Sequence, residues 1–112
     1  MTNSRAKGAA GERELANKLK EYGYTARRTQ QFCGKAGDSD VVCEELDEYH
    51  IEVKRVERLN IDKAMEQSLS DCKDKTPIVV HRRNKKPWMV TMYLEDWLWL
   101  VQLSSQSDRF SE

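Results

Sequence analysis

Apolar and polar residues alternate strictly in some segments of this chain and recur every three to four positions in others. Residues 49–54 alternate with a period of two, which is typical of a β-strand whose two faces meet different surroundings. Ile51 and Val53 are expected to point into the core, while Glu52 and Lys54 share the opposite face. The strand therefore brings a carboxylate and an amine together.

A second strand-like run, with three apolar residues in its middle, covers residues 40–44 and is followed by the acidic, turn-prone stretch at 45–48. The two runs are expected to pair as a β-hairpin. In any register that pairs residues of equal parity, Asp40 shares a face with Glu52 and Lys54, whereas a slip of one residue turns Asp40 away. The convergence of these three charged groups depends on that register.

Helical spacing marks three further segments. The first helix is expected from near Lys7 to Tyr22, where Gly23 stops it, and its apolar stripe ends with Tyr22. The other predicted elements are a helix at residues 61–72, strands at 77–80 and 87–93 that form a hairpin, and a helix at 94–103. This order predicts an α/β (α+β) fold with a mixed central sheet of about five strands flanked by helices.

The length of 112 residues suits one domain, residues 1–112, with flexible tails at 1–5 and 104–112. The cysteines are odd in number and widely spaced, which disfavours a disulfide framework or a structural zinc site. No apolar segment approaches membrane-spanning length, and the first residues lack a signal-peptide core. The expected location is the cytoplasm, in a prokaryotic or phage-infected cell.

Asp40 and Glu52 are two carboxylates predicted to lie close together. Each increases the other's tendency to hold a proton unless a cation sits between them. Oxygen ligands suit Mg²⁺ or Mn²⁺, which take their remaining ligands from water and a substrate phosphate. With Lys54 beside them, the pattern indicates a metal-dependent phosphodiesterase. The alternative is a solvated hairpin face with one surface ion pair.

Glu12 is predicted on the inward face of the first helix, because Leu15 follows it by three residues. A carboxylate turned toward the protein is costly unless it is paired or metal-bound, so the strand site is its expected partner. Local pairing by Arg13 is the alternative. Glu14 lies four residues before Lys18 and is interpreted as an ordinary solvated partner without a function.

Three motifs occur in order along the chain: Lys7-Gly8-x-x-Gly11-Glu12-Arg13-Glu14-Leu15, Asp40-Val41-Val42 and Ile51-Glu52-Val53-Lys54. Together they resemble the archaeal-type Holliday junction resolvases of the PD-(D/E)XK nuclease superfamily, in the small form carried by phages and prophages. The resemblance covers roughly residues 5–101. It implies a restriction-endonuclease-like fold and a structure-selective DNA endonuclease that resolves four-way junctions, leaving a 5′-phosphate and a 3′-hydroxyl.

The resemblance also implies roles for individual residues. Asp40 would be the central metal-bridging carboxylate, with Glu52 as the second ligand and Glu12 as a further ligand, directly or through water. Lys54 would position the attacking water and offset charge that grows on the phosphate. Mg²⁺ is the implied cofactor, with Mn²⁺ as a substitute.

The chain departs from the family pattern beside the central aspartate. The usual Pro-Asp becomes Ser39-Asp40, which loses a rigid lead-in but none of the chemistry. Asp38 is an alternative ligand, although it falls outside the predicted strand. Family analogy also implies that Gln67 assists the site, but the helical period turns Gln67 away from the centre of its stripe.

The chain has nineteen basic and nineteen acidic residues, so its net charge does not favour binding to nucleic acid. Only the distribution of the basic residues over the surface can favour it. Arg28, on the strand before the loop at 30–37, is the best candidate for a phosphate clamp near the scissile bond. The basic connection at 81–86 either contacts phosphate or only solubilises its hairpin. The candidates for contact with DNA phosphates are Arg27, Arg28, Lys35, Arg55, Arg82, Arg83, Lys85 and Lys86.

The helix predicted at 94–103 is apolar on more than one face, so either a second subunit covers it or it packs on its own hairpin with Trp88 between them. A junction has two strands to cut symmetrically, which favours a homodimer.

The expected partners are branched DNA and a second copy of the chain, with no membrane and no small-molecule cofactor. The alternatives are another nuclease of the superfamily, for nicking, flap cutting or repair, and a non-catalytic DNA-binding module.

Overall fold

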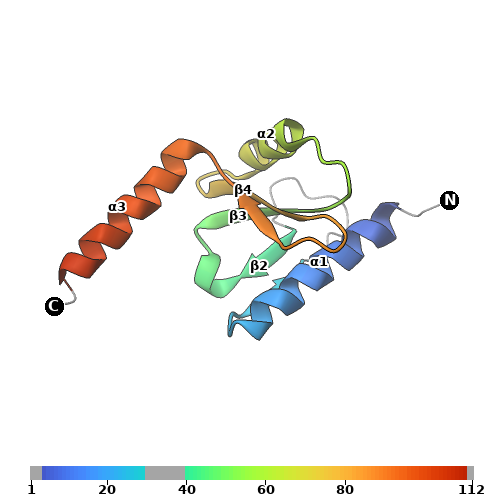
Figure 1. Cartoon of the computed structure of the whole chain (residues 1–112), viewed down its shortest axis with the longest axis horizontal. Helices are drawn as coiled ribbons and strands as arrows, with labels where there is room; N and C mark the ends of the chain where they lie inside the picture. Colours follow the sequence, from blue (N-terminus) through green and yellow to red (C-terminus); the bar gives the residue numbers. More distant parts are fainter. Residues whose placement is uncertain (1–3, 30–39, 111–112) are drawn as a thin grey trace.

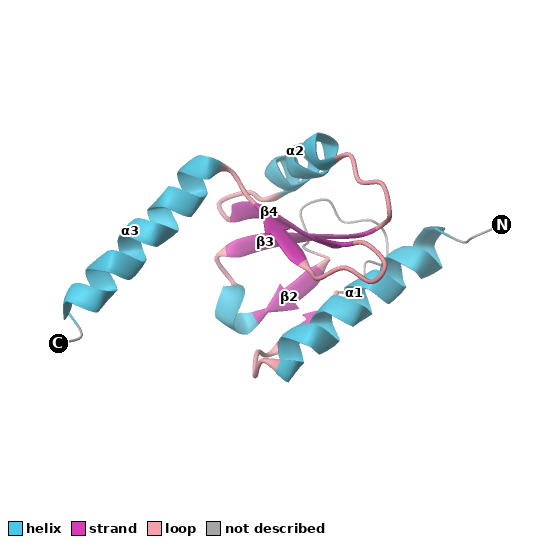
Figure 2. Ribbon diagram, in the orientation of Figure 1, coloured by secondary structure: helices cyan, strands magenta, loops and turns pink. Residues whose placement is uncertain are grey.

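The computed structural model describes residues 4–29 and 40–110. Two helices pack on the strands, and a third extends away from them (Figure 1, Figure 2). In chain order the elements are α1 (Ser4–Glu21), β1 (Ala26–Arg28), β2 (Val41–Cys43), a 3₁₀ turn (Glu44–Leu46), β3 (Tyr49–Arg55), α2 (Ile61–Asp71), β4 (Thr76–Arg82), β5 (Met89–Thr91) and α3 (Leu94–Phe110). The predicted α+β class and order of elements are confirmed.

The strands of the described ranges form two sheets. β1 and β2 pair antiparallel, while the second sheet has the order β3-β4-β5. The prediction that residues 40–44 and 49–54 pair as a hairpin is wrong, because β2 pairs with β1. The 3₁₀ turn carries the chain from β2 to the other sheet. A backbone hydrogen bond from Asp40 N to Ile51 O (3.1 Å) joins the two sheets.

β3 and β4 are parallel, so the chain needs a crossover between them, and α2 supplies it. Asn60 caps α2 by accepting a hydrogen bond from Lys63 N (3.1 Å). The hydroxyl of Ser68, on the buried face of α2, lies within hydrogen-bond distance of the carbonyls of His50 (3.3 Å) and Ile78 (3.0 Å) and shares its one proton between them. One side chain thereby ties the helix to both parallel strands. β5 completes the predicted hairpin with β4.

The core lies between α1 and the strands. Leu15 and Ala16 of α1 pack with Ile51 and Val53 of β3, so the predicted inward face of β3 is confirmed. On the other side of β3 and β4, α2 contributes a smaller cluster through its own buried residues. Figure 1 shows α1 and α2 on opposite sides of β3 and β4. Tyr22 was predicted on the apolar stripe but is exposed, since α1 ends one residue earlier.

α3 continues to Phe110, well beyond the end predicted at residue 103. Residues 104–106 are polar and exposed. Polar side chains are compatible with a helix in solvent, so the change to polar residues after position 103 did not mark the end of α3. Large apolar side chains of α3 face solvent, among them Trp97 (52% exposed) and Trp99 (62%). Trp88 packs against the main core instead of filling a gap beneath α3. Within the described ranges, no helix combines the length and hydrophobicity needed to cross a bilayer.

Candidate metal and phosphate site

Four charged residues predicted for the site line one pocket of about 330 Å³. Glu12 comes from α1, Asp40 from the residue before β2, and Glu52 and Lys54 from β3. The packing of α1 on β3 and the backbone bond between the two sheets bring these segments together. The convergence inferred from alternation is therefore present, although no β2–β3 ladder produces it.

Asp40 is fixed directly on β3. Its Oδ2 accepts a hydrogen bond from the backbone N–H of Val53 (2.9 Å), and its own N–H bonds to the carbonyl of Ile51. Burial, and then the negative charge of Glu52, raise the pKa of Asp40 to about 7, while the Val53 hydrogen bond lowers it. The carboxyl thus holds a proton near neutral pH in the absence of a cation.

Glu52 is almost fully buried, with 4% exposure. One carboxylate oxygen lies 3.7 Å from Nε2 of His50, and the other lies 3.8 Å from Nζ of Lys54. The carboxylate is therefore held between a ring nitrogen and an ammonium group on the same strand. Because residues 50, 52 and 54 have the same parity, all three side chains leave β3 on one face.

His50 is a residue that sequence reasoning missed. Its side chain is buried, and donor atoms of His50, Glu52 and Asp71 all lie within 4.8 Å of one another. The signal was present in part, since His50 precedes Glu52 by two positions in the strand. The contribution of Asp71 could not be read from the sequence, because it depends on how the end of α2 packs against β3.

Glu12 pairs with Arg28 rather than with Arg13. Nε of Arg28 donates to Oε1 of Glu12 at 2.9 Å, and both side chains are partly buried. Arg13 is exposed on α1, so the alternative of local pairing does not describe Glu12. Arg28, the residue expected to clamp a phosphate, consequently lies beside the pocket and orients one of its carboxylates.

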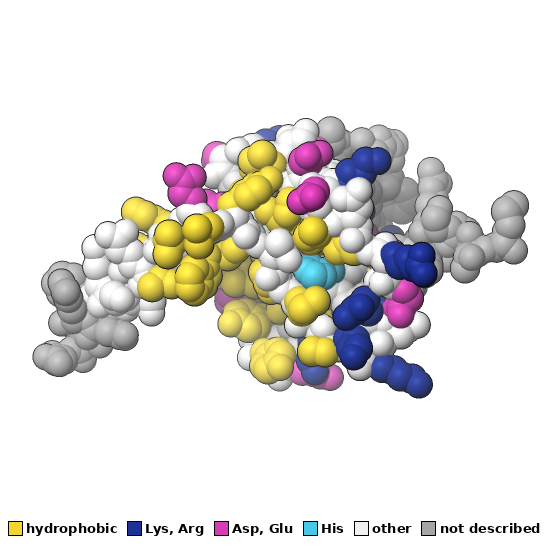
Figure 3. All heavy atoms as spheres, turned by 45° about the horizontal axis from the view of Figure 1, so that its top comes forward, with side chains coloured by type: hydrophobic (Ala, Val, Ile, Leu, Met, Phe, Trp, Pro, Cys, Tyr) yellow, Lys and Arg dark blue, Asp and Glu magenta, His cyan; other side chains and the backbone are white. Residues whose placement is uncertain are grey.

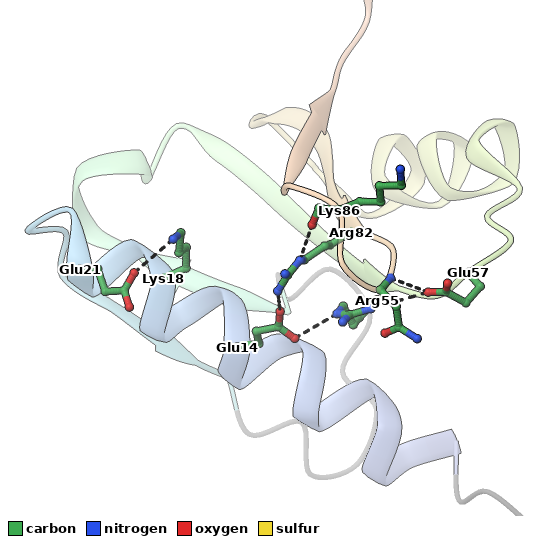
Figure 4. Close-up of polar contacts among 8 residues, drawn as sticks. Glu14, Lys18, Glu21, Arg55, Glu57, Arg82 and Lys86 are labelled. Carbon is green, nitrogen blue, oxygen red and sulfur yellow. Dashed lines mark hydrogen bonds and ion pairs between the residues drawn. The ribbon is translucent and has the colours of Figure 1, made fainter.

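The interpretation of Glu14 as a solvated partner of Lys18 is wrong. Glu14 forms ion pairs with Arg55 of β3 (3.0 Å) and with Arg82 of β4, whereas Lys18 pairs with Glu21 (3.3 Å). Figure 4 shows Glu14 pointing from α1 toward both arginines, with Lys18 and Glu21 farther along the helix. The partners come from distant strands, so local helical spacing could not reveal them.

Four other residues predicted to contact DNA lie at the surface. Arg27, Arg83, Lys85 and Lys86 are exposed, and basic side chains gather on one side of the face seen in Figure 3, away from α3. Gln67 is exposed and lines a neighbouring pocket of about 380 Å³ together with Lys54. Lys35 and Ser39 lie outside the described residues.

The donor set of the pocket suits a hard divalent cation. Asp40, Glu52 and Glu12 offer carboxylate oxygens, the ligands that Mg²⁺ and Mn²⁺ prefer. The geometry supports this fit, because Asp40 and the buried Glu52 line the same pocket, and two crowded carboxylates bind either a proton or a cation. His50 adds an imidazole beside Glu52, which suits Mn²⁺ better than Mg²⁺.

Comparison with known proteins gives two findings. A family model described as "Phage putative PDDEXK endonuclease" matches residues 3–110, and a search of curated proteins found no match. Among solved structures, the chain is similar to Archaeoglobus fulgidus Hjc, described as a Holliday junction resolvase from an archaeal hyperthermophile. The TM-score is 0.56 at 23% sequence identity, over 77% of this chain and 72% of that chain. This likeness confirms the restriction-endonuclease-like fold.

Proposed function

Because this chain belongs to the phage PDDEXK endonuclease family, we propose that it is a divalent-metal-dependent DNA endonuclease that resolves four-way junctions. The observation that carries the proposal is the convergence of Glu12, Asp40, Glu52 and Lys54 in one pocket. The likeness of the fold to that of Hjc, a Holliday junction resolvase, favours branched DNA as the substrate. Such DNA is present in the cytoplasm of a prokaryotic or phage-infected cell.

The residues of the pocket divide the work of phosphodiester hydrolysis. Asp40 and Glu52 would hold the cation, Mg²⁺ or as a substitute Mn²⁺, and Glu12 would be a further ligand. When bound, the cation supplies Lewis acidity toward a phosphoryl oxygen and lowers the pKa of water. Lys54 positions the attacking water and offsets the negative charge that develops on the phosphate. The Val53 hydrogen bond keeps Asp40 oriented throughout.

Phosphate contacts lie on the elements around the pocket. Arg28 holds Glu12 and lies beside the scissile position, so it is suited to clamp the reacting phosphate. The turn between β4 and β5 and the exposed face of β1 carry further basic side chains toward neighbouring phosphates. The proposed contacts are Arg27, Arg28, Lys35, Arg55, Arg82, Arg83, Lys85 and Lys86.

A homodimer completes the proposal. α3 exposes a continuous set of large apolar side chains, and no other described element covers it (Figure 1). A second copy that packs on α3 would bury this surface and present two pockets to the two strands of one junction. Two symmetric cuts require such an arrangement.

One assay tests the proposal. The protein is incubated with a synthetic four-way junction, linear duplex, flap and nicked DNA, each with Mg²⁺ and with EDTA. We expect paired cuts in the junction only with Mg²⁺. Strong cutting of linear duplex, flap or nicked DNA would indicate another nuclease of the same family. Binding without cleavage under every metal condition would indicate a non-catalytic DNA-binding module.

A further inference from the structure

Arg55 and Arg82 are direct neighbours in the sheet. They are cross-strand partners at the last positions of β3 and β4. Like charges placed opposite each other in a sheet destabilise it, so an anion between the two guanidinium groups stabilises this pair. The carboxyl ends of parallel strands are also where α/β sheets commonly bind ligands.

In this structure the anion is the carboxylate of Glu14. Its Oε2 accepts a hydrogen bond from Nε of Arg55 (3.0 Å), and its Oε1 accepts one from Nη1 of Arg82. Each oxygen thus serves one arginine, as two oxygens of a phosphodiester would do. About a third of the Glu14 and Arg82 side chains is exposed, so an outside anion can reach them.

The stem of Arg55 is held in place beneath α1. A Cβ atom added at Gly11 would lie 2.6 Å from the Cβ of Arg55, so the helix backbone covers the base of this side chain. Nη1 of Arg55 also lies 3.9 Å from Glu57, which accepts a hydrogen bond from Asn84 N (2.6 Å) in the β4–β5 turn. The guanidinium group is therefore preorganised at a fixed position.

The two arginines adjoin the candidate pocket. Arg55 follows Lys54 on β3 and lines the same pocket as Glu12 and Asp40. Arg82 is the cross-strand partner of Arg55 at the end of β4, so both guanidinium groups lie next to that pocket, where a neighbouring backbone phosphate can reach them. The chemical class of ligand that fits two partly exposed guanidinium groups at this place is a backbone phosphodiester.

We propose that Arg55 and Arg82 form a phosphate subsite that Glu14 occupies in the DNA-free protein, and that a backbone phosphate takes the place of Glu14 on binding. The inference rests on the proposed function. It adds Glu14 as a residue that limits the affinity of the protein for DNA. Glu14 keeps the two arginines together before DNA arrives. Its charge then opposes the incoming phosphate, so binding must displace it.

The experiment measures DNA binding without cleavage. Glu14→Gln removes the competing charge, and Glu21→Gln makes the same charge change on the same helix, at a residue that pairs only with Lys18 among the contacts of the described residues. Affinity for a four-way junction is measured in EDTA by fluorescence anisotropy. We expect Glu14→Gln to bind about tenfold more tightly, which corresponds to about 1.4 kcal/mol, and Glu21→Gln to stay close to wild type.

A second variant assigns the gain to the subsite. Arg82→Gln should weaken binding, and the double variant Glu14→Gln, Arg82→Gln should lose most of the gain seen with Glu14→Gln alone. Equal affinities of Glu14→Gln and Glu21→Gln would overturn the inference, as would weaker binding by Glu14→Gln, since the carboxylate would then only organise the arginines. Absence of DNA binding by every protein, wild type included, would remove the proposed function itself.

The wild-type protein supplies a readout that does not depend on how the variants fold. The Nε–Hε signal of Arg55 and the Nη–H signals of Arg82, the groups that donate to Glu14, are followed by nuclear magnetic resonance as DNA is added. If phosphate replaces Glu14, the signals of both arginines shift in step with saturation, while the side chain of Lys18 is unaffected. Signals of both arginines that stay unchanged at saturating DNA would overturn the inference.

Discussion

Asp40 and Val53 are joined by a hydrogen bond of 2.9 Å, in which the backbone N–H of Val53 donates to Oδ2 of Asp40. The bond anchors a carboxylate from one sheet to the strand that carries Glu52 and Lys54. Because the donor is backbone, the orientation of Asp40 does not depend on a flexible side chain. The carboxylate of Asp40, a proposed metal ligand, is therefore preorganised.

Replacement of Asp40 should separate cleavage from binding. Asp40→Asn keeps the shape of the side chain but removes the charge that attracts the cation. Loss of one preorganised electrostatic group costs on the order of 10²–10³ in rate, and at least this loss is expected in Mg²⁺. Junction affinity in EDTA should change little, because the proposed phosphate contacts are made by other residues.

Asp74→Asn is the matched control, because Asp74 is exposed and does not line the pocket. It should cleave at the wild-type rate. Single-turnover kinetics on a labelled junction measure all three proteins. Wild-type cleavage by Asp40→Asn would remove Asp40 from the assigned role.

His50 should tune the affinity for metal through Glu52. Its Nε2 lies 3.7 Å from Oε1 of Glu52, so His50→Ala removes one of the two neighbours that hold this carboxylate and leaves Lys54 on the other side. Loss of a group that orients a metal ligand typically lowers metal affinity about 10–100-fold. Calorimetric titration with Mg²⁺ and with Mn²⁺ measures this, and the larger loss is expected for Mn²⁺. If His50→Ala lowers the stability of the protein but leaves the affinities for both metals unchanged, His50 has only a packing role.

The sequence predicted the main features of the site because they follow from local periodicity. The parity of Glu52 and Lys54 in β3 and the inward position of Glu12 on α1 are consequences of strand and helix geometry. The partners of Glu14 were missed for the opposite reason. Arg55 and Arg82 reach Glu14 from 41 and 68 residues away, and only tertiary packing brings them there.

The fold was predictable to a similar degree. The strand-like runs in the sequence correctly marked the strands. They did not reveal that β2 pairs with β1, because the pairing of strands depends on backbone partners that residue patterns do not encode. The helix at the C-terminal side was underestimated, since residues 104–106 are polar yet helical. Apolar residues at helical spacing predict the buried face of a helix. The polar end of α3 projects into solvent, so no such spacing marks it as helical.

Gly11 should be required for the close approach of α1 to β3. A Cβ at this position would lie 2.6 Å from the Cβ of Arg55, and neither atom is at the flexible end of a side chain. Overpacking of this kind typically costs about 1–3 kcal/mol and the gain in helix propensity offsets about 1 kcal/mol, so Gly11→Ala should be destabilising by about 1 kcal/mol. Because α1 must move outward, Glu12 shifts from the pocket and cleavage should fall as well.

Gly8→Ala is the control on the same helix, because nothing among the described residues lies within 4 Å of a Cβ there. This change should stabilise the protein by roughly 0.5–1 kcal/mol through helix propensity alone. Urea unfolding measures both variants. A Gly11→Ala protein as stable as Gly8→Ala would show that the helix is not tightly apposed to β3.

The apolar surface of α3 should mediate self-association. Trp97 is large and half exposed, and a central interface aromatic commonly contributes on the order of 2 kcal/mol or more. Trp97→Glu is therefore expected to convert a dimer into a monomer at micromolar concentration. Gln102→Glu, with the same added charge on an exposed residue of α3, should remain dimeric. Sedimentation equilibrium distinguishes the two, and a monomeric wild type would contradict the proposed homodimer.

Asp40 should give the metal-free protein a characteristic dependence of stability on pH. Burial and the charge of Glu52 raise the pKa of Asp40 in the folded state from its ordinary 3.8 to about 7. Between these values the folded protein holds a proton that the unfolded chain has released. The contribution of Asp40 to the free energy of unfolding therefore falls as the pH rises through this window.

In EDTA, we expect the protein to be less stable at about pH 7.5 than at about pH 5.5, by on the order of 2 kcal/mol, since one pKa unit corresponds to about 1.4 kcal/mol. Asp40→Asn cannot titrate, so its urea unfolding curves should lack this part of the slope. Mg²⁺ should stabilise the wild type more at the higher pH, because there it need not displace a proton. Identical slopes for the wild type and Asp40→Asn would mean that Asp40 is already ionised in the folded protein, and the crowding of Asp40 and Glu52 would then not be what draws a cation into the pocket.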